Sequence, residues 1–357
     1  MLARLSALTG ILVVLAWGVG RWFNDDHLWS QWLFWIPTLV VVVFAWVTLV
    51  VSAICSKLSL RMGGVKLRPF LAVGALVATG WMIVSWHPMN VGAGWNTPNT
   101  PRYTVAYWNI SVDRQAQDAA DAVLEEEPDI AIVANIRWDV HREPLVTKLR
   151  SLAPAEGEGV HVLQRGSLSI AGRFPIRRYG VARLERVATL LESWRSERDT
   201  GRITFVEFET SEDLGGVPLT VWIVDLPSDP SMKRADVMRA ASRAVSAWEG
   251  VAMAPDALGR WIQQTPVEGE RGFPEPDLII GDFNAPRGSR SIGQLVGDRP
   301  STHAQAGVGP AGTWMRYLPL WAIDQAYTGD RVKATRSSVV DPGLSEHRML
   351  VVELERD

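Results

Sequence analysis

Two short motifs in the second half of the chain combine side chains that can carry out hydrolytic chemistry. The tetrapeptide at 281–284 (GDFN) follows the apolar run at 278–280 (LII), so Asp282 and Asn284 come just past the end of a buried strand. A carboxylate and a carboxamide at this position can hold a hard cation or orient an attacking water. An Asx turn that closes a strand explains the same residues equally well.

The second motif is Ser345-Glu346-His347, which precedes the apolar segment at 349–354. An acid beside a histidine can fix its tautomer and raise its basicity, which prepares a general base, although an ordinary surface turn has the same composition. Asn109 and Asn135 end two further predicted strands, where each taken alone is typical of a turn.

Alternating and short apolar runs predict the strands that would position these side chains. Residues 103–109 alternate as a half-buried strand, 116–126 carry apolar residues at helical spacing, and 129–134 form a short apolar run. Further strands are predicted at 160–163, 168–171, 183–190, 203–210, 219–226, 278–280, 322–327 and 349–354, and helices at 143–152, 230–248 and 291–296. Many strands with few helices indicate packed sheets with helices outside.

Charge is distributed unevenly along the 357 residues, and the amino-terminal part is apolar. The first 95 residues hold six Lys or Arg and two Asp, which leaves 30 of the 36 basic and 37 of the 39 acidic side chains for the rest. This acidic balance argues against a surface built for non-specific binding of a nucleic-acid backbone. The single cysteine, Cys55, excludes an intrachain disulfide, so there are no disulfide partners.

Three apolar segments, at about 5–19, 29–55 and 69–86, approach the length of about 20 residues that crosses a bilayer. We therefore predict three transmembrane helices within 1–86, a linker rich in Pro, Gly and Asn at 87–101, and one folded domain at 102–357.

The orientation follows from the basic residues, because Lys and Arg near span ends stay on the cytoplasmic side. Four of them crowd the second connection (Lys57, Arg61, Lys66 and Arg68), whereas the first connection has Arg21 against Asp25 and Asp26. This predicts a multi-pass protein of the cell membrane with a cytoplasmic amino terminus and an extracytoplasmic carboxy-terminal domain. The lipid bilayer is then a partner, with tryptophans as interfacial anchors (Trp22, Trp29, Trp32, Trp35, Trp81 and Trp86).

In chain order, these motifs resemble the endonuclease/exonuclease/phosphatase superfamily, the metal-dependent phosphoesterases that include DNase I, exonuclease III and the inositol polyphosphate 5-phosphatases. The matching positions are Asn109, Asn135, 172–176, 221–228, 281–284, 313–314, 323–324 and 345–347. The resemblance covers about 102–354, is most specific at 281–284, and with three preceding spans is most similar to bacterial membrane-anchored members. It implies a DNase I-like α/β (α+β) four-layer sandwich of two packed mixed β-sheets flanked by helices, and Mg²⁺ or Mn²⁺ at one end of the sheets.

The resemblance also implies residue roles. Asp282 would orient or deprotonate the attacking water and Asn284 would hold the scissile phosphate. His347 would be the catalytic histidine, with Glu346 and Asp324 as its acids. For substrate binding it implies Asn109, and Arg173 is a further candidate for an anion contact, although a solvated Arg explains it equally well. The candidate metal ligands are Asn109, Asn135, Asp225 and Glu346.

Two positions depart from the family pattern. Asn135 stands where the family has a metal-binding Glu, and Asp225 stands where it has a second histidine. Losing one ligand charge should weaken binding of a hard cation by roughly tenfold or more, and losing a positioned acid or base costs about 10²- to 10⁴-fold in rate. Asp225 can instead become a ligand itself, so a rearranged metal site and an inactive one both remain open.

The expected function is that of a membrane-anchored extracytoplasmic phosphoesterase that depends on a divalent metal and hydrolyses phosphodiester or phosphomonoester bonds. A phosphorylated small molecule, a phospholipid head group and a nucleic acid are all open as substrates. The alternative is a catalytically impaired pseudoenzyme of the same fold that acts as a membrane-tethered binding module.

Overall fold

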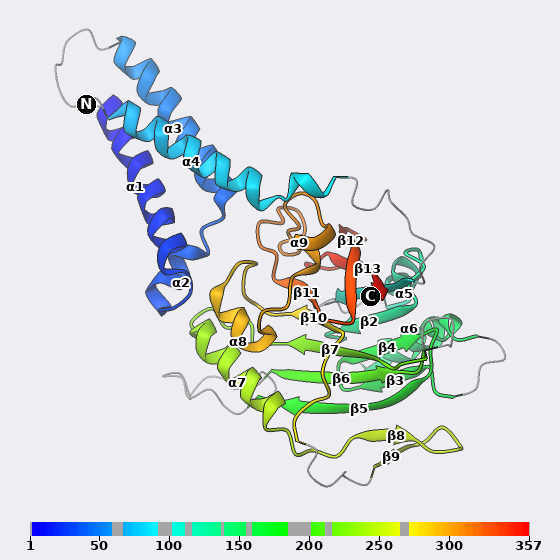
Figure 1. Cartoon of the computed structure of the whole chain (residues 1–357). Coiled ribbons are helices and arrows are strands. Elements are labelled where there is room, and N and C mark those ends of the chain that lie inside the picture. The colour runs from blue at the N-terminus through cyan, green and yellow to red at the C-terminus, as the bar shows by residue number, and fades with distance from the viewer. Residues whose placement is uncertain are drawn as a thin grey trace.

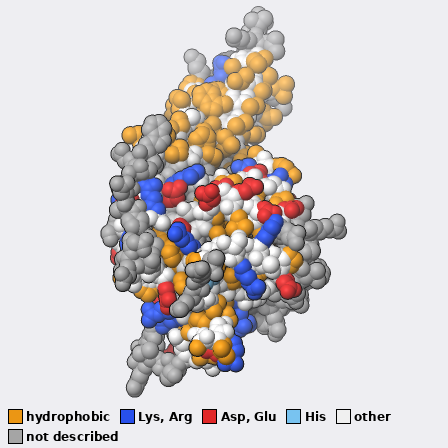
Figure 2. Space-filling model, turned by 90° about the vertical axis from the view of Figure 1, so that its right-hand side faces the viewer, with side chains coloured by type: hydrophobic (Ala, Val, Ile, Leu, Met, Phe, Trp, Pro, Cys, Tyr) orange, Lys and Arg blue, Asp and Glu red, His pale blue; other side chains and the backbone are white. Residues whose placement is uncertain are grey.

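The computed structural model describes residues 2–58, 67–91, 102–110, 116–136, 139–154, 159–184, 201–210, 216–264 and 271–356. A bundle of long helices stands at one end of a domain built on β-sheets (Figure 1). In the face shown in Figure 2, hydrophobic side chains cover the bundle, whereas charged side chains of both signs are spread over the domain. Most of the predicted linker, at 92–101, lies outside the described residues, as do Arg61, Lys66 and the end of the predicted strand at 185–190.

Three helices of the bundle are long and apolar enough to cross a membrane, namely α1 (Leu2–Phe23), α3 (Thr38–Leu58) and α4 (Arg68–Ser85). A short helix, α2 (Leu28–Phe34), lies between α1 and α3. The prediction of one unbroken apolar segment from residue 29 is therefore wrong at its start. Pro37 stands between the two helices, and proline lacks the N–H group that a continuing helix would use.

The domain holds two mixed sheets. The first has the order β12-β13-β1-β2-β4-β3, with bounds Val332–Val340, Met349–Arg356, Arg102–Asn109, Ile130–Ala134, Leu168–Gly172 and Val162–Arg165. The second has the order β11-β10-β7-β6-β5-β8-β9, with bounds Asp324–Thr328, Leu278–Asp282, Leu219–Asp225, Arg202–Phe208, Ile176–Arg183, Met253–Pro255 and Trp261–Gln263.

Helices cover the outer faces of both sheets. Against the first sheet pack α5 (Ala116–Leu124) and α6 (Asp139–Leu149), and against the second pack α7 (Arg234–Ser246) and α8 (Gly293–Val296). A short helix, α9 (Thr302–Ala306), lies beside β12, and 3-10 turns occur at Pro88–Asn90, Arg150–Leu152 and Arg290–Ile292. The predicted four-layer sandwich of two packed mixed sheets is confirmed.

The alternation within β1 shows how the sequence builds these layers. Tyr103, Val105 and Tyr107 belong to the core between the two sheets, whereas Ala106 and Trp108 belong to the core under α5 and α6. Because successive side chains of a strand point to opposite faces, Asn109 at the end of β1 is on the side of the second sheet. The functional side chains occupy this end of the gap between the sheets.

Candidate active site

A row of charged side chains crosses five neighbouring strands of the second sheet. In register, Asp324 of β11 pairs with Asp282 of β10, Asp282 with Asp225 of β7, Asp225 with Arg202 of β6, and Arg202 with Arg183 of β5. Residues paired in register have side chains on the same face of a sheet. Three acids and two arginines therefore lie side by side at one end of these strands, on the same face of the sheet.

The tetrapeptide at 281–284 needs its glycine for close packing of strands. A Cβ atom at Gly281 would meet the backbone oxygen of Val224 at 2.0 Å, so only glycine lets β10 lie this close to β7. Two residues later, Asn284 has a φ of +48°, a left-handed conformation that asparagine tolerates better than most residues. Its backbone N–H donates to Asp282 Oδ1 (2.9 Å) and its side-chain amide donates to the Leu226 carbonyl (2.8 Å).

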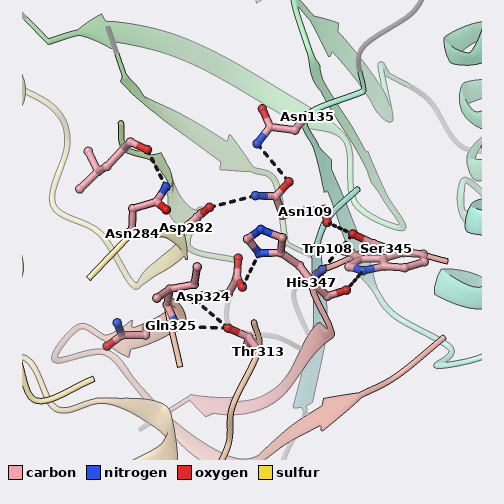
Figure 3. A network of polar contacts seen from close by, with 12 residues as sticks. Trp108, Asn109, Asn135, Asp282, Asn284, Thr313, Asp324, Gln325, Ser345 and His347 are labelled. Atoms are coloured by element: carbon pink, nitrogen blue, oxygen red, sulfur yellow. Dashed lines mark hydrogen bonds and ion pairs between the residues drawn. The ribbon is translucent and has the colours of Figure 1, made fainter. Parts of the chain in front are cut away.

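Two asparagines at strand ends of the first sheet extend toward Asp282, as Figure 3 shows. The amide of Asn109 donates to Asp282 Oδ2 (2.9 Å), and the amide of Asn135 donates to the side-chain oxygen of Asn109 (3.0 Å). Asn135 follows β2 with a φ of +60°, so it also serves as the turn residue that its sequence context predicts. The chain of amides ends on a buried carboxylate.

His347 completes the cluster. Its Nδ1 is 2.9 Å from Asp324 Oδ2, and its backbone is held by Ser345 and Trp108, since its N–H donates to Ser345 Oγ (3.0 Å) and its carbonyl accepts from Trp108 Nε1 (2.9 Å). Thr313 Oγ1 accepts the backbone N–H of Asp324 (3.0 Å). The histidine and its acid are thus positioned by neighbours on both sheets (Figure 3).

Burial and crowding shift the protonation of this cluster. Burial, together with the negative charge of Asp324, raises the pKa of Asp282 to about 8. Burial alone would lower the pKa of His347, but the charge and hydrogen bond of Asp324 outweigh it and raise this pKa to about 9. The cluster therefore has an excess of buried negative charge that either a proton or a cation can neutralise.

These donors fit a divalent metal ion. Ligand atoms of Asp282, Asp324 and His347 lie within 4.8 Å of one another, and all three side chains are buried. The second carboxylate oxygen of Asp324 is buried and has no hydrogen-bond partner among the described residues. An unpaired carboxylate oxygen beside a second carboxylate is the oxygen-rich environment that Mg²⁺ or Mn²⁺ prefers.

The structure places the other predicted residues in three different surroundings. Asp225 is half-buried in the row and forms an ion pair with Arg202 (3.1 Å). Glu346 is exposed next to His347, and its negative charge is among those that raise the histidine's pKa. Arg173 lies at the opposite edge of the sheet, 3.5 Å from Asp129, because β4 runs antiparallel to β2 and ends where β2 begins.

A cavity of about 1590 Å³ adjoins the cluster, and its lining includes Asn109, Asn135, Asp225, Asp282, Asn284 and His347. Neither Arg173 nor Glu346 is among the described residues that line it.

Sequence reasoning missed several other residues of the cavity wall. Arg165, Arg183 and Arg202 line it, and so do Trp32 and Trp35 from the connection between α1 and α3. The arginines had no local signal, since they become neighbours only through strand pairing. The sequence predicted the two tryptophans as anchors at the membrane interface, and that role does not predict a contact with the domain.

Comparisons with known proteins agree with this architecture. Residues 106–347 match the model of the Endonuclease/Exonuclease/phosphatase family. A search of curated protein sequences finds no match.

Among solved structures, the chain is similar to an endonuclease/exonuclease/phosphatase from Beutenbergia cavernae, with 15% identity and a TM-score of 0.47 over 71% of this chain and 72% of that one. It is also similar to an endonuclease/exonuclease/phosphatase family protein from Bacteroides thetaiotaomicron, with 14% identity and a TM-score of 0.48 over 73% of this chain and 100% of that one. The family match covers most of the chain, which therefore belongs to the endonuclease/exonuclease/phosphatase family.

Proposed function

We propose that this chain is a membrane-anchored phosphoester hydrolase that depends on a divalent metal ion. The observation that carries the proposal is the buried group of Asp282, Asp324 and His347, of which Asp282 and His347 line a large cavity together with the arginines of the same sheet. Clustered carboxylates with a histidine supply acid–base chemistry, and arginines supply contacts to a phosphate. The family name covers endonucleases, exonucleases and phosphatases, all of which hydrolyse phosphoesters.

We assign a different chemical role to Asp282 and to His347. Asp282, held by Asn109 and by the backbone of Asn284, is placed to orient a water and accept its proton. His347, kept protonated by Asp324, is placed to donate to a phosphate oxygen or to the leaving group. A bound Mg²⁺ or Mn²⁺ would be held by Asp282 and Asp324 and would supply charge stabilisation for the phosphate.

The arginines explain how a carboxylate can stand at position 225. Arg202 neutralises Asp225 through their ion pair, and it also donates to the hydroxyl of Ser167. The repulsion expected between Asp225 and an anionic substrate is thereby reduced, and Arg183 adds a second positive charge to the same wall. We therefore assign Asp225 to the orientation of Arg202 and not to a metal.

We further propose that the domain is extracytoplasmic. The end of α4 at Ser85 meets the domain, where its carbonyl accepts from Arg287 (3.2 Å), and α2 lies at this same end of the bundle (Figure 1). Arg68, at the start of α4, lies at the far end. Since the basic connection stays in the cytoplasm, the opposite end and the domain are outside. Alkaline phosphatase becomes active only when it folds outside the cytoplasm. Fused after Asp357, it should be active, and an inactive fusion would contradict the proposed orientation.

The hydrolase proposal is tested with purified full-length protein, Mn²⁺ and two soluble esters, p-nitrophenyl phosphate and bis(p-nitrophenyl) phosphate. We expect His347→Ala to lower the rate by about 10²- to 10⁴-fold. The matched control is His161→Ala, since His161 is also buried but contacts the Gly172 carbonyl at the far edge of the sheet. The proposal fails if the parent hydrolyses neither ester with Mn²⁺ or Mg²⁺.

One observation favours the pseudoenzyme as a second candidate. The side-chain oxygen of Asn109, which could serve a metal, already accepts from the amide of Asn135. If Mn²⁺ fails to stabilise the folded protein against heat, the site does not bind this metal and the binding-module function is the better one.

A further inference from the structure

The connection between the first two spans is docked on the domain. Gln31 of α2 is fully buried, and its amide donates to the carbonyls of Pro230 (3.2 Å) and Met232 (3.1 Å), while its oxygen accepts the backbone N–H of Arg234 (2.8 Å). Every polar atom of this side chain is thus used by the segment that leads into α7. A glutamine with three such bonds fixes α2 in position and in rotation.

A second set of contacts holds the residues before α2. The carboxylate of Asp25 is buried and accepts from the backbone N–H of Ser291 (3.1 Å) and from its hydroxyl. Asn24 accepts the backbone N–H of Arg290 (2.8 Å) and donates to the Gly288 carbonyl (3.0 Å). The connection therefore meets the domain as a specific interface and not as a passing loop.

This docking brings two tryptophans into the wall of the active-site cavity. Trp32 and Trp35 line the same cavity as Asp282 and His347, and their rings pack with centroids 5.7 Å apart. Trp35 is held in turn by Trp321, whose indole N–H donates to its carbonyl (2.9 Å). One part of the cavity wall is thus aromatic and comes from the membrane region.

If the three apolar helices cross a bilayer as proposed, the same helix lies where the bundle leaves it. It connects two apolar spans directly, and Trp29 and Trp32 remain about half exposed, at 52% and 48%. Tryptophan side chains prefer the interface between hydrocarbon and water. Trp32 therefore belongs both to the cavity wall and to the surface that α2 presents at the bilayer.

We propose that the substrate is the phosphoester of a membrane lipid and that α2 is the element that admits it, an inference that rests on the proposed hydrolase function. The phosphate reaches the cluster around His347, while the apolar part of the lipid lies along Trp32 and Trp35 toward the bilayer. In the reaction, a water oxygen forms a bond to phosphorus, the P–O bond to the alcohol breaks, and the alcohol oxygen takes up a proton. A soluble phosphoester would leave the aromatic wall unused.

The experiment compares lipid and soluble esters on the full chain in dodecyl maltoside micelles with Mn²⁺. The lipid probes are dioleoyl phosphatidic acid and dioleoyl phosphatidylglycerol, and their soluble counterparts are glycerol 3-phosphate and glycerophosphoglycerol. We expect kcat/KM for at least one lipid to exceed that of its counterpart by about tenfold or more, because only the lipid buries apolar surface against the tryptophans.

Variants of α2 test the role of the helix. Trp32→Ala should lower kcat/KM for the lipid by about tenfold and lower kcat/KM for its soluble glycerol counterpart much less, because that counterpart has no apolar part to pack on the ring. Trp32→Phe should restore most of the loss. Trp29→Ala is the matched control, since Trp29 is exposed on the same helix and does not line the cavity. It should leave both rates unchanged.

The outcomes separate the two proposals. If the soluble esters are hydrolysed but no lipid is preferred, or if Trp32→Ala lowers both rates alike, the lipid proposal is overturned and the hydrolase function stands. If the parent hydrolyses none of the esters, the hydrolase function fails and the lipid proposal fails with it.

Discussion

Replacing Asp282 by asparagine should stabilise the metal-free protein while it removes activity. The carboxyl group of Asp282 is 3% exposed and lies in register with Asp324 and Asp225. Its pKa is raised from 3.8 to about 8 by burial first and by the charge of Asp324 second. Between pH 3.8 and about pH 8, the carboxyl group of Asp282 therefore keeps its proton in the folded state and loses it in the unfolded state.

The size of the effect follows from this difference. A raised carboxyl pKa destabilises the folded state as the pH rises, by up to about 1.4 kcal/mol for each pH unit between the two pKa values. At pH 7.5, which is about 3.7 pH units above 3.8, the total is at most about 5 kcal/mol. Asparagine at 282 keeps the acceptor for the backbone of Asn284 but loses the one for Asn109, at a cost of about 1 kcal/mol. The expected net gain at pH 7.5 is therefore at most about 4 kcal/mol.

The assay is thermal denaturation of the full-length protein with EDTA at several values between pH 5 and pH 8. Asp282→Asn should denature at a higher temperature than the parent, by a margin that grows with pH. Asp277→Asn is the matched control just before the same strand. Buried Asp277 accepts from Arg331 (2.7 Å) and from the backbone N–H of Thr220 (2.8 Å), so its replacement should destabilise the protein. With Mn²⁺ added, only the parent and the control should gain stability.

The reasoning is refuted if Asp282→Asn denatures below the parent at every pH in EDTA. That result would mean that the hydrogen bonds of the carboxylate outweigh its burial, and that the acids of the row do not repel one another in the folded state.

Three further predictions concern other parts of the molecule. Asn135→Glu adds a ligand charge and should tighten Mn²⁺ binding about tenfold or more, as measured by calorimetric titration. Burial, and after it the charge of Arg287, lower the pKa of His303 to about 3. Because the unfolded state binds a proton below pH 6.5 that the folded state does not bind, the stability of the protein should fall by up to about 1.4 kcal/mol for each pH unit below 6.5. A denaturation series from pH 4.5 to 7 should show a smaller fall for His303→Gln. Asp25→Ala leaves the buried N–H and hydroxyl of Ser291 without an acceptor, which should destabilise this contact by about 1–3 kcal/mol. The backbone amide of Ser291 should then exchange its hydrogen faster than in the parent.

Much of the fold was predictable because its signals are local. The runs at 130–134, 219–225 and 278–280 are buried strands, and they lie where short apolar segments had indicated them. The residues proposed from the resemblance at 109, 135, 282, 324 and 347 do lie together, because the ends of neighbouring strands meet at one edge. Their catalytic roles remain proposals until activity is measured.

The rest depended on pairings that no local pattern encodes. Arg202 reaches Asp225 only through the register of β6 on β7, and Arg173 is carried away from the cluster by the direction of β4. The strands β5, β8, β9 and β12 were not predicted. The strand expected at 183–190 shares only Arg183 with β5. The strands β8 and β9 have only three residues each, and β12 mixes Lys, Arg and Ser with its apolar residues. The place of α2 was equally hidden, because its partners follow it by about 200 residues or more, as the bonds of Gln31 to Pro230 and Met232 show.

The docked connection also has a consequence for biosynthesis. Asp25 and Ser291 are 266 positions apart, so the connection between α1 and α3 leaves the ribosome long before its partners exist. During this interval the buried faces of Gln31 and Asp25 are without the groups that satisfy them in the mature protein. The spans are then inserted first, and the later segments of the domain that contain Arg234 and Ser291 dock onto the connection once it is in the membrane. A contact of such long range forms late in folding, so the wall of the active-site cavity is completed only after the segment that contains Ser291 has been synthesised.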